Sequence, residues 1–318
     1  MQLNWLKKIG NKAVHNAFVD LCEFNQQLFC CYREAKNHIS AEAGICILTL
    51  NKEGKVCNIN RLKMANVDLR DPKLSITPDG RLLLIAYARK TNHNNGTLSV
   101  RNLCWVSQTG HSWSSHREFA AKGGWLWRVR WQQDIAYGFA YSKKNNTIHL
   151  YSGDPRRSFH CHQPNALSLQ KHNKGYPNES DLLFEDDNAY AIVRRDADSY
   201  SAQLGTSGYP YKKWQWLDLG LYIGGPVMLK IAPKVAIVAG RIIKKGKLVT
   251  GLMQLNLSNG KLFELGILPS AGDNSYPGLV LDGQILYVSY YSSHQDNKSS
   301  VYLAQLDLSL LINKDELA

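Results

Sequence analysis

The chain has 318 residues, 44% of them hydrophobic, so it is long enough and apolar enough to bury a full core. Its 38 lysines and arginines outnumber the 26 acidic residues and give a formal net charge of +12. That excess favours an anionic partner, such as nucleic acid, an acidic lipid surface or an acidic glycan, and solubility is the simpler alternative. No nucleic-acid-binding motif is recognisable, so nucleic acid is not an expected partner.

Targeting signals are not apparent in the sequence. No segment contains the roughly 18 consecutive apolar residues of a membrane helix. Residues 1–16 lack the apolar stretch and the small-residue cleavage site of a signal peptide. The seven cysteines include no C-x-x-C pair, which predicts free thiols in a reducing compartment. We therefore expect a protein of the cytoplasm, or one exported by a route that needs no N-terminal signal.

Short strand-like runs separated by turn residues dominate the sequence, and helical periodicity is almost absent, which predicts an all-β fold. A unit of strand, tight turn and strand recurs with turns spaced about 50 residues apart, a length typical of the blades of a β-propeller. The sequence therefore predicts a six-bladed β-propeller that forms a single domain over 1–318. In chain order, the turns fall near residues 26, 79, 133, 186, 233 and 283.

The ends of the chain are expected to close the ring. Residues 299–308 alternate well and are predicted to form an outer strand of the last blade. The region around residues 12–20 is predicted to pair nearby. Closure would remove the exposed sheet edges that otherwise promote aggregation.

Charged and phenolic residues recur at one end of the six hairpins, where the first strand of each unit begins and the second ends. Arginine binds carboxylates through two parallel hydrogen bonds, and a tyrosine beside a glutamate can act as a nucleophile. This composition predicts a site for an acidic ligand at the mouth of the central channel; surface ion pairs that cap strand ends are the alternative. The set comprises Asp20, Arg33, Asp71, Arg89, Arg128, Glu179, Arg194, Arg241, Tyr276 and Tyr291.

Four short motifs within this set resemble the sialidase superfamily. "YRE" at 32–34 resembles its first-blade arginine motif, and "NES…VRR" places Glu179 before Arg194. "AGR" supplies Arg241, and "SYPGLVLDGQILYVSYY" begins the hairpin that contains Tyr276. The order of these residues along the chain is also the order found in that family.

The resemblance implies a six-bladed propeller that cleaves a carboxylate-bearing sugar. Tyr276 would attack the anomeric carbon and Glu179 would accept its proton, since a neutral phenol avoids repulsion by the substrate's carboxylate. Asp71 is the provisional acid/base, with Glu34 and Glu42 as competing candidates. The arginines that would hold the substrate carboxylate are Arg33, Arg194 and Arg241.

The chain departs from the family pattern in its outer turns. The S-x-D-x-G-x-T-W boxes typical of sialidases survive only as relics at 106–113, where Gln108 replaces the aspartate, and at 207–214. The glutamate that often follows the tyrosine hairpin is replaced by Tyr290-Tyr291. The region from 205 to 226 resembles a bacterial branch of sialidase-like proteins.

Two further segments bear on ligand binding. "GGWLWRVRW" at 123–131 places Trp125, Trp127 and Trp131 on one strand face, which suits either sugar stacking or packing between blades. "FHCHQP" places His160 and His162 on one side of a strand, but no third ligand follows at a known zinc spacing. We expect neither a metal nor another cofactor. Additional binding residues are expected at Arg89, Trp127, Arg128 and Tyr291.

The sequence thus supports two functional hypotheses. The first is a sialidase-like exo-glycosidase with a tyrosine nucleophile that acts on an acidic sugar. The second is a non-catalytic propeller that binds an anionic glycan or a protein through the same rim. The two hypotheses differ in whether one carboxyl group lies within hydrogen-bonding distance of Tyr276 and another lies across the pocket.

Overall fold

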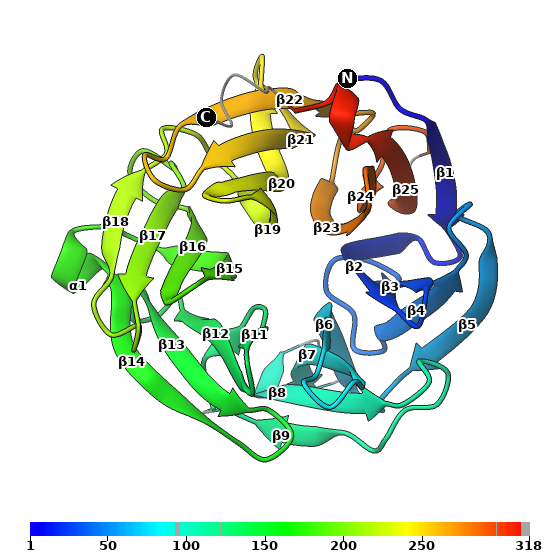
Figure 1. Ribbon diagram of the computed structural model, residues 1–318. Coiled ribbons are helices and arrows are strands. Elements are labelled where there is room, and N and C mark those ends of the chain that lie inside the picture. The colour runs from blue at the N-terminus through cyan, green and yellow to red at the C-terminus, as the bar shows by residue number, and fades with distance from the viewer. Residues whose placement is uncertain (93–95, 121, 297, 313–318) are drawn as a thin grey trace.

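The computed structural model describes residues 1–92, 96–120, 122–296 and 298–312. In this part of the chain, six antiparallel sheets surround a central axis as the blades of a propeller (Figure 1). Helical structure is limited to α1 (Leu169–His172) and a 3₁₀ turn at Leu308–Leu310, and none of the described helices is long and apolar enough to cross a membrane. The predicted all-β, six-bladed architecture is confirmed.

The first five blades each follow the chain order from the inner strand to the outer strand. Blade 1 contains β2 (His15–Phe24), β3 (Gln27–Ala35), β4 (Gly44–Leu50) and β5 (Val56–Leu62). Blade 2 contains β6 (Val67–Ile76), β7 (Leu82–Thr91), β8 (Thr97–Ser107) and β9 (Arg117–Phe119). Blade 3 has an inner edge split into β10 (Trp125–Leu126) and β11 (Arg130–Gln132), followed by β12 (Ile135–Ser142), β13 (Thr147–Asp154) and β14 (Ser158–Ser168).

The remaining three blades have four strands each. Blade 4 contains β15 (Pro177–Glu185), β16 (Asn188–Arg195), β17 (Gln203–Gly208) and β18 (Gln215–Asp218). Blade 5 contains β19 (Gly224–Ala232), β20 (Val235–Lys244), β21 (Lys247–Asn256) and β22 (Leu262–Leu268). Blade 6 combines β23 (Asn274–Asp282), β24 (Ile285–Ser292) and β25 (Ser300–Asp307) with the N-terminal strand β1 (Trp5–Gly10).

The pattern of apolar and polar residues in each strand follows from how deeply the strand is buried in its blade. The inner half of each blade is covered on both faces by neighbouring blades, so a second strand such as β7 reads as a nearly continuous apolar run, LLLIAYA. The outer strand β5 alternates between half-buried and exposed residues because one of its faces meets solvent.

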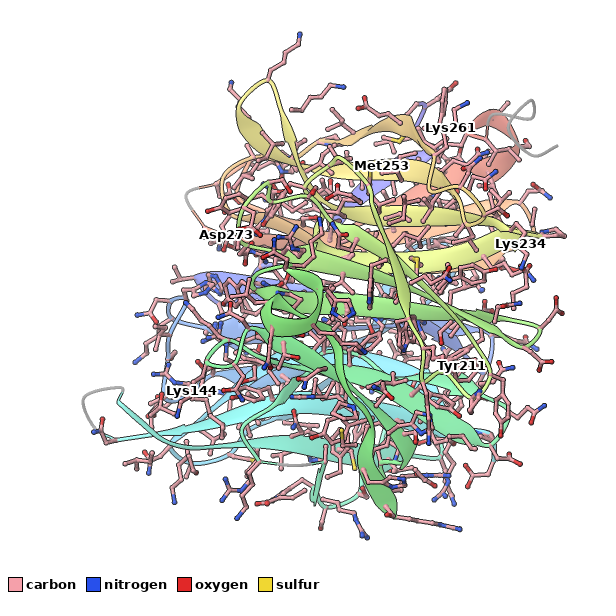
Figure 2. All side chains as sticks on the ribbon, turned by 90° about the vertical axis from the view of Figure 1, so that its left-hand side faces the viewer. Lys144, Tyr211, Lys234, Met253, Lys261 and Asp273 are labelled. Carbon is pink, nitrogen blue, oxygen red and sulfur yellow. The ribbon has the colours of Figure 1, made fainter. Side chains whose placement is uncertain are left out.

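The six expected turns all join the inner strand of a blade to its second strand. Each turn contains a residue with positive φ, as a tight hairpin connection requires. These residues are Gln26, Gly80, Gln133, Asp186, Lys234 and Gly283. Figure 2 views the ring edge-on and places Lys234, at one of these turns, on the opposite face from Asp273, which directly precedes β23.

The ring closes differently from the prediction. β1 pairs with β25, with Trp5 opposite Gln305 and Lys8 opposite Tyr302, so β25 is a third strand and β1 is the outer one. Residues 15–24 form the buried inner strand of blade 1. The expected pairing of the region around 12–20 is present at its start, where His15 forms a parallel bridge with Ser299. Asn16 still links the ends of the ring, since its side-chain amide donates to the carbonyl of Ser299 at 2.7 Å.

A buried network of ion pairs joins the inner strands near the axis. Arg128 Nη1 donates to both carboxylate oxygens of Asp20, at 2.8 and 2.9 Å, and Arg128 Nε lies 3.6 Å from Asp181. Arg130 forms two hydrogen bonds with Asp181, at 2.8 and 2.6 Å. The same carboxylates accept backbone N–H groups of Leu74 in β6 and Met228 in β19, each at 2.8 Å. Five blades are thereby tied together.

We predict that Asp181→Asn will lower the free energy of unfolding by about 3 kcal/mol, because Arg130 loses its buried counter-charge and Arg128 keeps only Asp20. The matched control is Asp79→Asn, which alters two ion pairs, with Arg81 and Arg156, at a solvent-exposed turn and should cost much less, under about 1 kcal/mol for each pair. Urea unfolding of both variants beside the unmodified protein measures the difference. Equal losses in the two variants would show that the central network does not stabilise the ring.

Candidate active site

Five of the inner strands carry a β-bulge at the same place, just after they begin. The pairing register with the second strand shifts there, and such a shift turns side chains away from the regular pleat. The bulges bring residues from several blades to one end of the channel. The residues within them are Phe18-Val19, Asp71-Pro72, Asn178-Glu179, Gly225-Pro226 and Tyr276-Pro277.

Three bulge residues with large or charged side chains adopt the left-handed backbone conformation. The φ angles are 61° at Phe18, 49° at Asp71 and 51° at Tyr276. This conformation costs roughly 1–2 kcal/mol for a residue with a Cβ atom, and it persists at sites where function requires a particular side-chain direction. All three residues line the same pocket.

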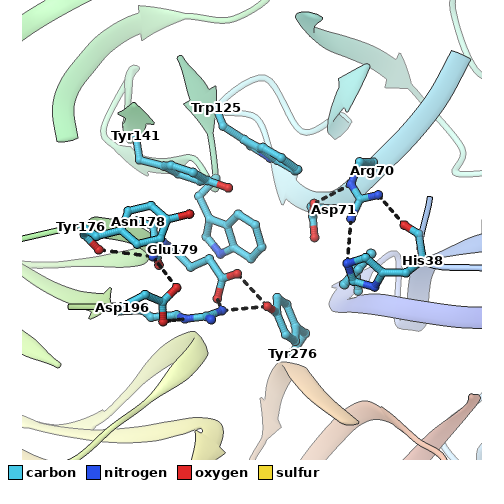
Figure 3. A pocket seen from close by; sticks show the side chains of 13 residues that line it. His38, Arg70, Asp71, Trp125, Tyr141, Tyr176, Asn178, Glu179, Asp196 and Tyr276 are labelled. Atoms are coloured by element: carbon cyan, nitrogen blue, oxygen red, sulfur yellow. Dashed lines mark hydrogen bonds and ion pairs between the residues drawn. The ribbon is translucent and has the colours of Figure 1, made fainter. Parts of the chain in front are cut away.

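The pocket has a volume of about 210 Å³ and combines aromatic with charged walls (Figure 3). Its floor includes Trp127, and the buried ammonium group of Lys73 lies 5.1 Å from the centre of that indole ring. Trp125 and Tyr141 form a stacked pair with ring centres 5.6 Å apart. The charged residues that line the pocket are Arg70, Asp71, Glu179, Arg194 and Asp196.

Tyr276, Glu179 and Arg194 form a closely bonded group, which we call the Tyr276 triad. The Tyr276 hydroxyl donates to Glu179 Oε1 at 2.7 Å, and Arg194 Nη1 donates to the Tyr276 oxygen at 2.9 Å. Arg194 Nη1 and the backbone N–H of Gly225 both donate to Glu179 Oε2 at 2.7 Å. The phenol proton is therefore already directed at a carboxylate that is held in place.

Groups around Tyr276 shift the pKa of its phenol in opposite directions. Burial and the negative charge of Glu179 raise the pKa of the Tyr276 phenol, whereas Arg194 and Arg241 lower it. The guanidinium carbon of Arg241 lies 5.0 Å from the centre of the Tyr276 ring. The two arginines are thus placed to stabilise negative charge on the phenol oxygen when its proton moves to Glu179.

Asp71 supplies a second carboxyl group to the pocket. Figure 3 shows Asp71 and Glu179 on opposite sides, with Tyr276 between them. Burial raises the pKa of Asp71 to about 6, against the opposing effect of Arg70 and Lys73. A carboxyl group with that pKa can both donate and accept a proton near neutral pH.

The other two acid/base candidates lie elsewhere. Glu34 forms an ion pair with Arg61 at 2.7 Å on the outside of blade 1, and Glu42 is exposed on the loop between β3 and β4. Neither residue lines the pocket. Of the three carboxyl groups considered from the sequence, only Asp71 is placed to act on a ligand bound there.

The expected clamp of three arginines is not assembled in the pocket. Arg194 lines it, but Arg241 lies behind Tyr276 and bonds to Asp273 at 2.9 Å and to the Tyr291 hydroxyl at 3.0 Å. Arg33 is fully buried, with two hydrogen bonds to Asp68 at 2.7 and 3.0 Å. Its remaining nitrogen bonds to His15 and to the backbone of residue 37, so no part of Arg33 is available to a ligand.

Arg70 lines the pocket instead, a residue that sequence reasoning missed. Its Nη1 donates to the carbonyl of His38 at 2.7 Å and to Asp68 at 3.1 Å, and its guanidinium group lies over Phe18 and Trp125. A signal was present in "LRDP", because Arg70 directly precedes the bulge at Asp71. Further polar wall residues that were not anticipated are His38, Asn178, Tyr176 and Asp196.

Of the remaining expected binding residues, some line the pocket and the others make contacts elsewhere in the fold. Trp127 and Trp125 line the pocket, whereas Trp131 lies against Arg156 outside it. Arg128 is taken up by the central ion pairs, and Arg89 bonds to Thr97 on blade 2. Tyr291 lies one layer behind the wall and donates to Asp273 at 2.8 Å.

One cluster among the described residues could place three ligand atoms around a metal ion. His15, His38 and Asp273 bring those atoms within 4.8 Å of one another. The cluster is surrounded by arginine side chains, since Arg33 bonds to His15 and Arg241 bonds to Asp273. This positive environment opposes a cation. His162, considered from the sequence, bonds to the carbonyl of residue 210 instead.

Comparison with known proteins identifies the fold of this chain but not its activity. No family model and no curated protein matches the chain. Among solved structures, a protein of unknown function from Dyadobacter fermentans is similar at a TM-score of 0.79 and 15% identity, over 96% of this chain and 100% of that one. An α-L-arabinanase from Penicillium chrysogenum in complex with arabinobiose is similar at 0.72 and 13%, over 98% and 100%.

Sialidases are also among the similar structures. A sialidase from Trypanosoma rangeli, solved with 2,3-difluorosialic acid as a covalent intermediate, is similar at a TM-score of 0.66 and 11% identity. The match covers 96% of this chain but only 57% of the trypanosomal one. The chain therefore has a sialidase-like six-bladed propeller fold.

We predict that Asp71→Asn will be more stable than the unmodified protein above about pH 6, and equally stable below about pH 4. The folded-state pKa of about 6 exceeds the ordinary value of 3.8, so stability contributed by the protonated form is lost as the pH rises through 6. Asparagine removes this charge and tolerates the left-handed backbone. The expected gain at pH 8 is on the order of 2–3 kcal/mol, measured by urea unfolding.

Asp186→Asn is the matched control, because Asp186 has the same backbone conformation, with a φ of 51°, at an exposed turn. As a substitution at an exposed position, it should change the free energy of unfolding by under about 0.5 kcal/mol. A gain in Asp71→Asn that is equally large at pH 4 would show that the buried charge is not its cause.

Proposed function

We propose that the pocket is the active site of a retaining exo-glycoside hydrolase that acts on a carboxylate-bearing sugar with Tyr276 as its nucleophile. The observation that carries this proposal is the geometry of the Tyr276 triad, in which one phenol contacts both a carboxylate and a guanidinium group. Asp71 across the pocket would act as the acid/base, while Glu179 would take the proton of the tyrosine nucleophile.

In the first step, the Tyr276 oxygen bonds to the anomeric carbon while its proton passes to Glu179. The bond from that carbon to the leaving oxygen breaks, and Asp71 protonates this oxygen. In the second step, Asp71 takes a proton from water, the water oxygen attacks the anomeric carbon, and the bond to Tyr276 breaks. The Glu179 proton returns to the phenol, so the enzyme ends in its initial state.

A neutral nucleophile suits a sugar that carries a carboxylate on its anomeric carbon. A glutamate or aspartate in the same place would meet that carboxylate at close range, whereas the phenol gains charge only as it transfers its proton. The cavity of about 210 Å³ is smaller than the roughly 300–1,000 Å³ of drug-sized binding sites. That size favours one terminal sugar, which is why we propose exo rather than endo cleavage.

We predict that 2,3-difluorosialic acid will label the protein covalently and that the added mass will be located on Tyr276. The fluorine at the anomeric carbon departs as Tyr276 attacks, and the second fluorine slows hydrolysis of the resulting bond. Intact-mass measurement and peptide mapping detect the adduct. Tyr276→Phe should not be labelled.

Tyr290→Phe is the control for this experiment, because Tyr290 is also buried but donates to the carbonyl of residue 269, outside the pocket. It should label at the rate of the unmodified protein. If no adduct forms on the unmodified protein while a glycan array shows binding, the non-catalytic binding propeller replaces the enzyme.

We also predict that Asp71→Asn will slow hydrolysis of a sialylated oligosaccharide by about 10²–10⁴-fold, because an alcohol leaving group needs a proton. A 4-methylumbelliferyl sialoside should lose much less, since its phenolic leaving group departs without full protonation. With the unmodified protein, the rate on the oligosaccharide should fall as the pH rises through about 6. Equal losses on both substrates would argue against Asp71 as the acid.

A further inference from the structure

We infer that Arg70, together with the indole N–H group of Trp125 beside it, binds the acidic group of the ligand, because the arginines at 33 and 241 do not reach the pocket. This inference rests on the proposed function for the class of ligand, a sugar acid. It assigns a specificity-determining role to the wall of the pocket formed by His38, Arg70, Asp71 and Trp125.

The two arginines that line the pocket differ in how far their charge is neutralised. Arg194 contacts two carboxylates, Glu179 at 2.7 Å and Asp196 at 2.9 Å. A ligand carboxylate placed there would meet two negative charges that are already bound. Arg70, by contrast, lies 3.1 Å from Asp68, which it shares with Arg33 at 2.7 Å, and 4.0 Å from Asp71. Arg70 is therefore the less closely paired of the two arginines.

Hydrogen-bonding capacity is also left over on this side of the pocket. Arg70 Nη1 is bonded to His38 and Asp68, but Arg70 Nε has no hydrogen-bond partner among the described residues, and its contact with Asp71 is a long 4.0 Å. The indole N–H group of Trp125, whose ring lies against the Arg70 guanidinium group, is likewise unpartnered among those residues. Arg70 is more than nine-tenths buried. Donors of this kind are costly to bury unpaired, and they match the oxygens of an acidic group.

The position of Arg70 next to Asp71 agrees with the chemistry of the substrate. In a sugar acid of the proposed kind, the carboxylate and the leaving oxygen are attached to the same carbon atom. The groups that bind one and protonate the other must therefore be close neighbours. Arg70 and Asp71 are consecutive in the chain and both line the pocket, whereas Glu179, to which Arg194 is bonded, lies on the opposite side.

Equilibrium binding tests this assignment without requiring turnover. Isothermal titration calorimetry would compare N-acetylneuraminate and 3-deoxy-D-manno-oct-2-ulosonate, which carry the carboxylate on the anomeric carbon, with their uncharged methyl esters. The unmodified protein should bind at least one free acid about tenfold or more tightly than its ester. Arg70→Gln should abolish that preference, and Arg70→Lys should restore part of it because the charge returns without the planar fork.

Arg101→Gln is the matched control, because Arg101 pairs with Glu118 on the outer part of blade 2 and should leave the preference unchanged. Circular dichroism and unfolding would establish that Arg70→Gln is folded. A folded Arg70→Gln that keeps the preference for the acid would overturn the inference, as would failure of the unmodified protein to prefer any of the acids. Acid preference through Arg70 without a covalent adduct on Tyr276 would instead refute the catalytic proposal alone.

Discussion

The ion pairs between Asp20, Arg128 and Asp181 are the interaction on which the rest of the structure depends. A propeller has little backbone hydrogen bonding between its blades, so the blades must be held together by side chains near the axis. Here two buried carboxylates bridge blades through guanidinium groups and backbone N–H groups of β6 and β19. Burying such charges is favourable only because each is paired and hydrogen-bonded.

The inner strands that carry this network also supply the pocket. The bulges near their beginnings bring Phe18, Asp71, Glu179 and Tyr276 to its wall. The left-handed backbone at Phe18, Asp71 and Tyr276 is a local cost that the rigid ring can absorb. The result is a site whose reacting groups come from different blades yet meet at hydrogen-bonding distance.

Some arginines of this protein stabilise the fold through buried ion pairs, whereas others line the pocket. Arg33 and Arg128 are fully committed to buried carboxylates, and Arg241 supports Tyr276 from behind. Arg70 and Arg194 reach the pocket, and they differ in how closely carboxylates pair with them. Counting arginines in the sequence therefore cannot identify a ligand clamp, because their function depends on which acidic partners the fold supplies.

The sequence by itself determined the all-β class, the six-blade count and the turns, because alternating strands and turn residues are local signals that recur along the chain. It also pointed to Tyr276, Glu179, Arg194 and Asp71, since a repeat places equivalent positions at one end of the blades. Only the tertiary structure decided that β1 closes the ring, that Arg33 is enclosed by Asp68, and that Arg70 faces the pocket. These outcomes depend on contacts between blades far apart in sequence, which no local pattern encodes.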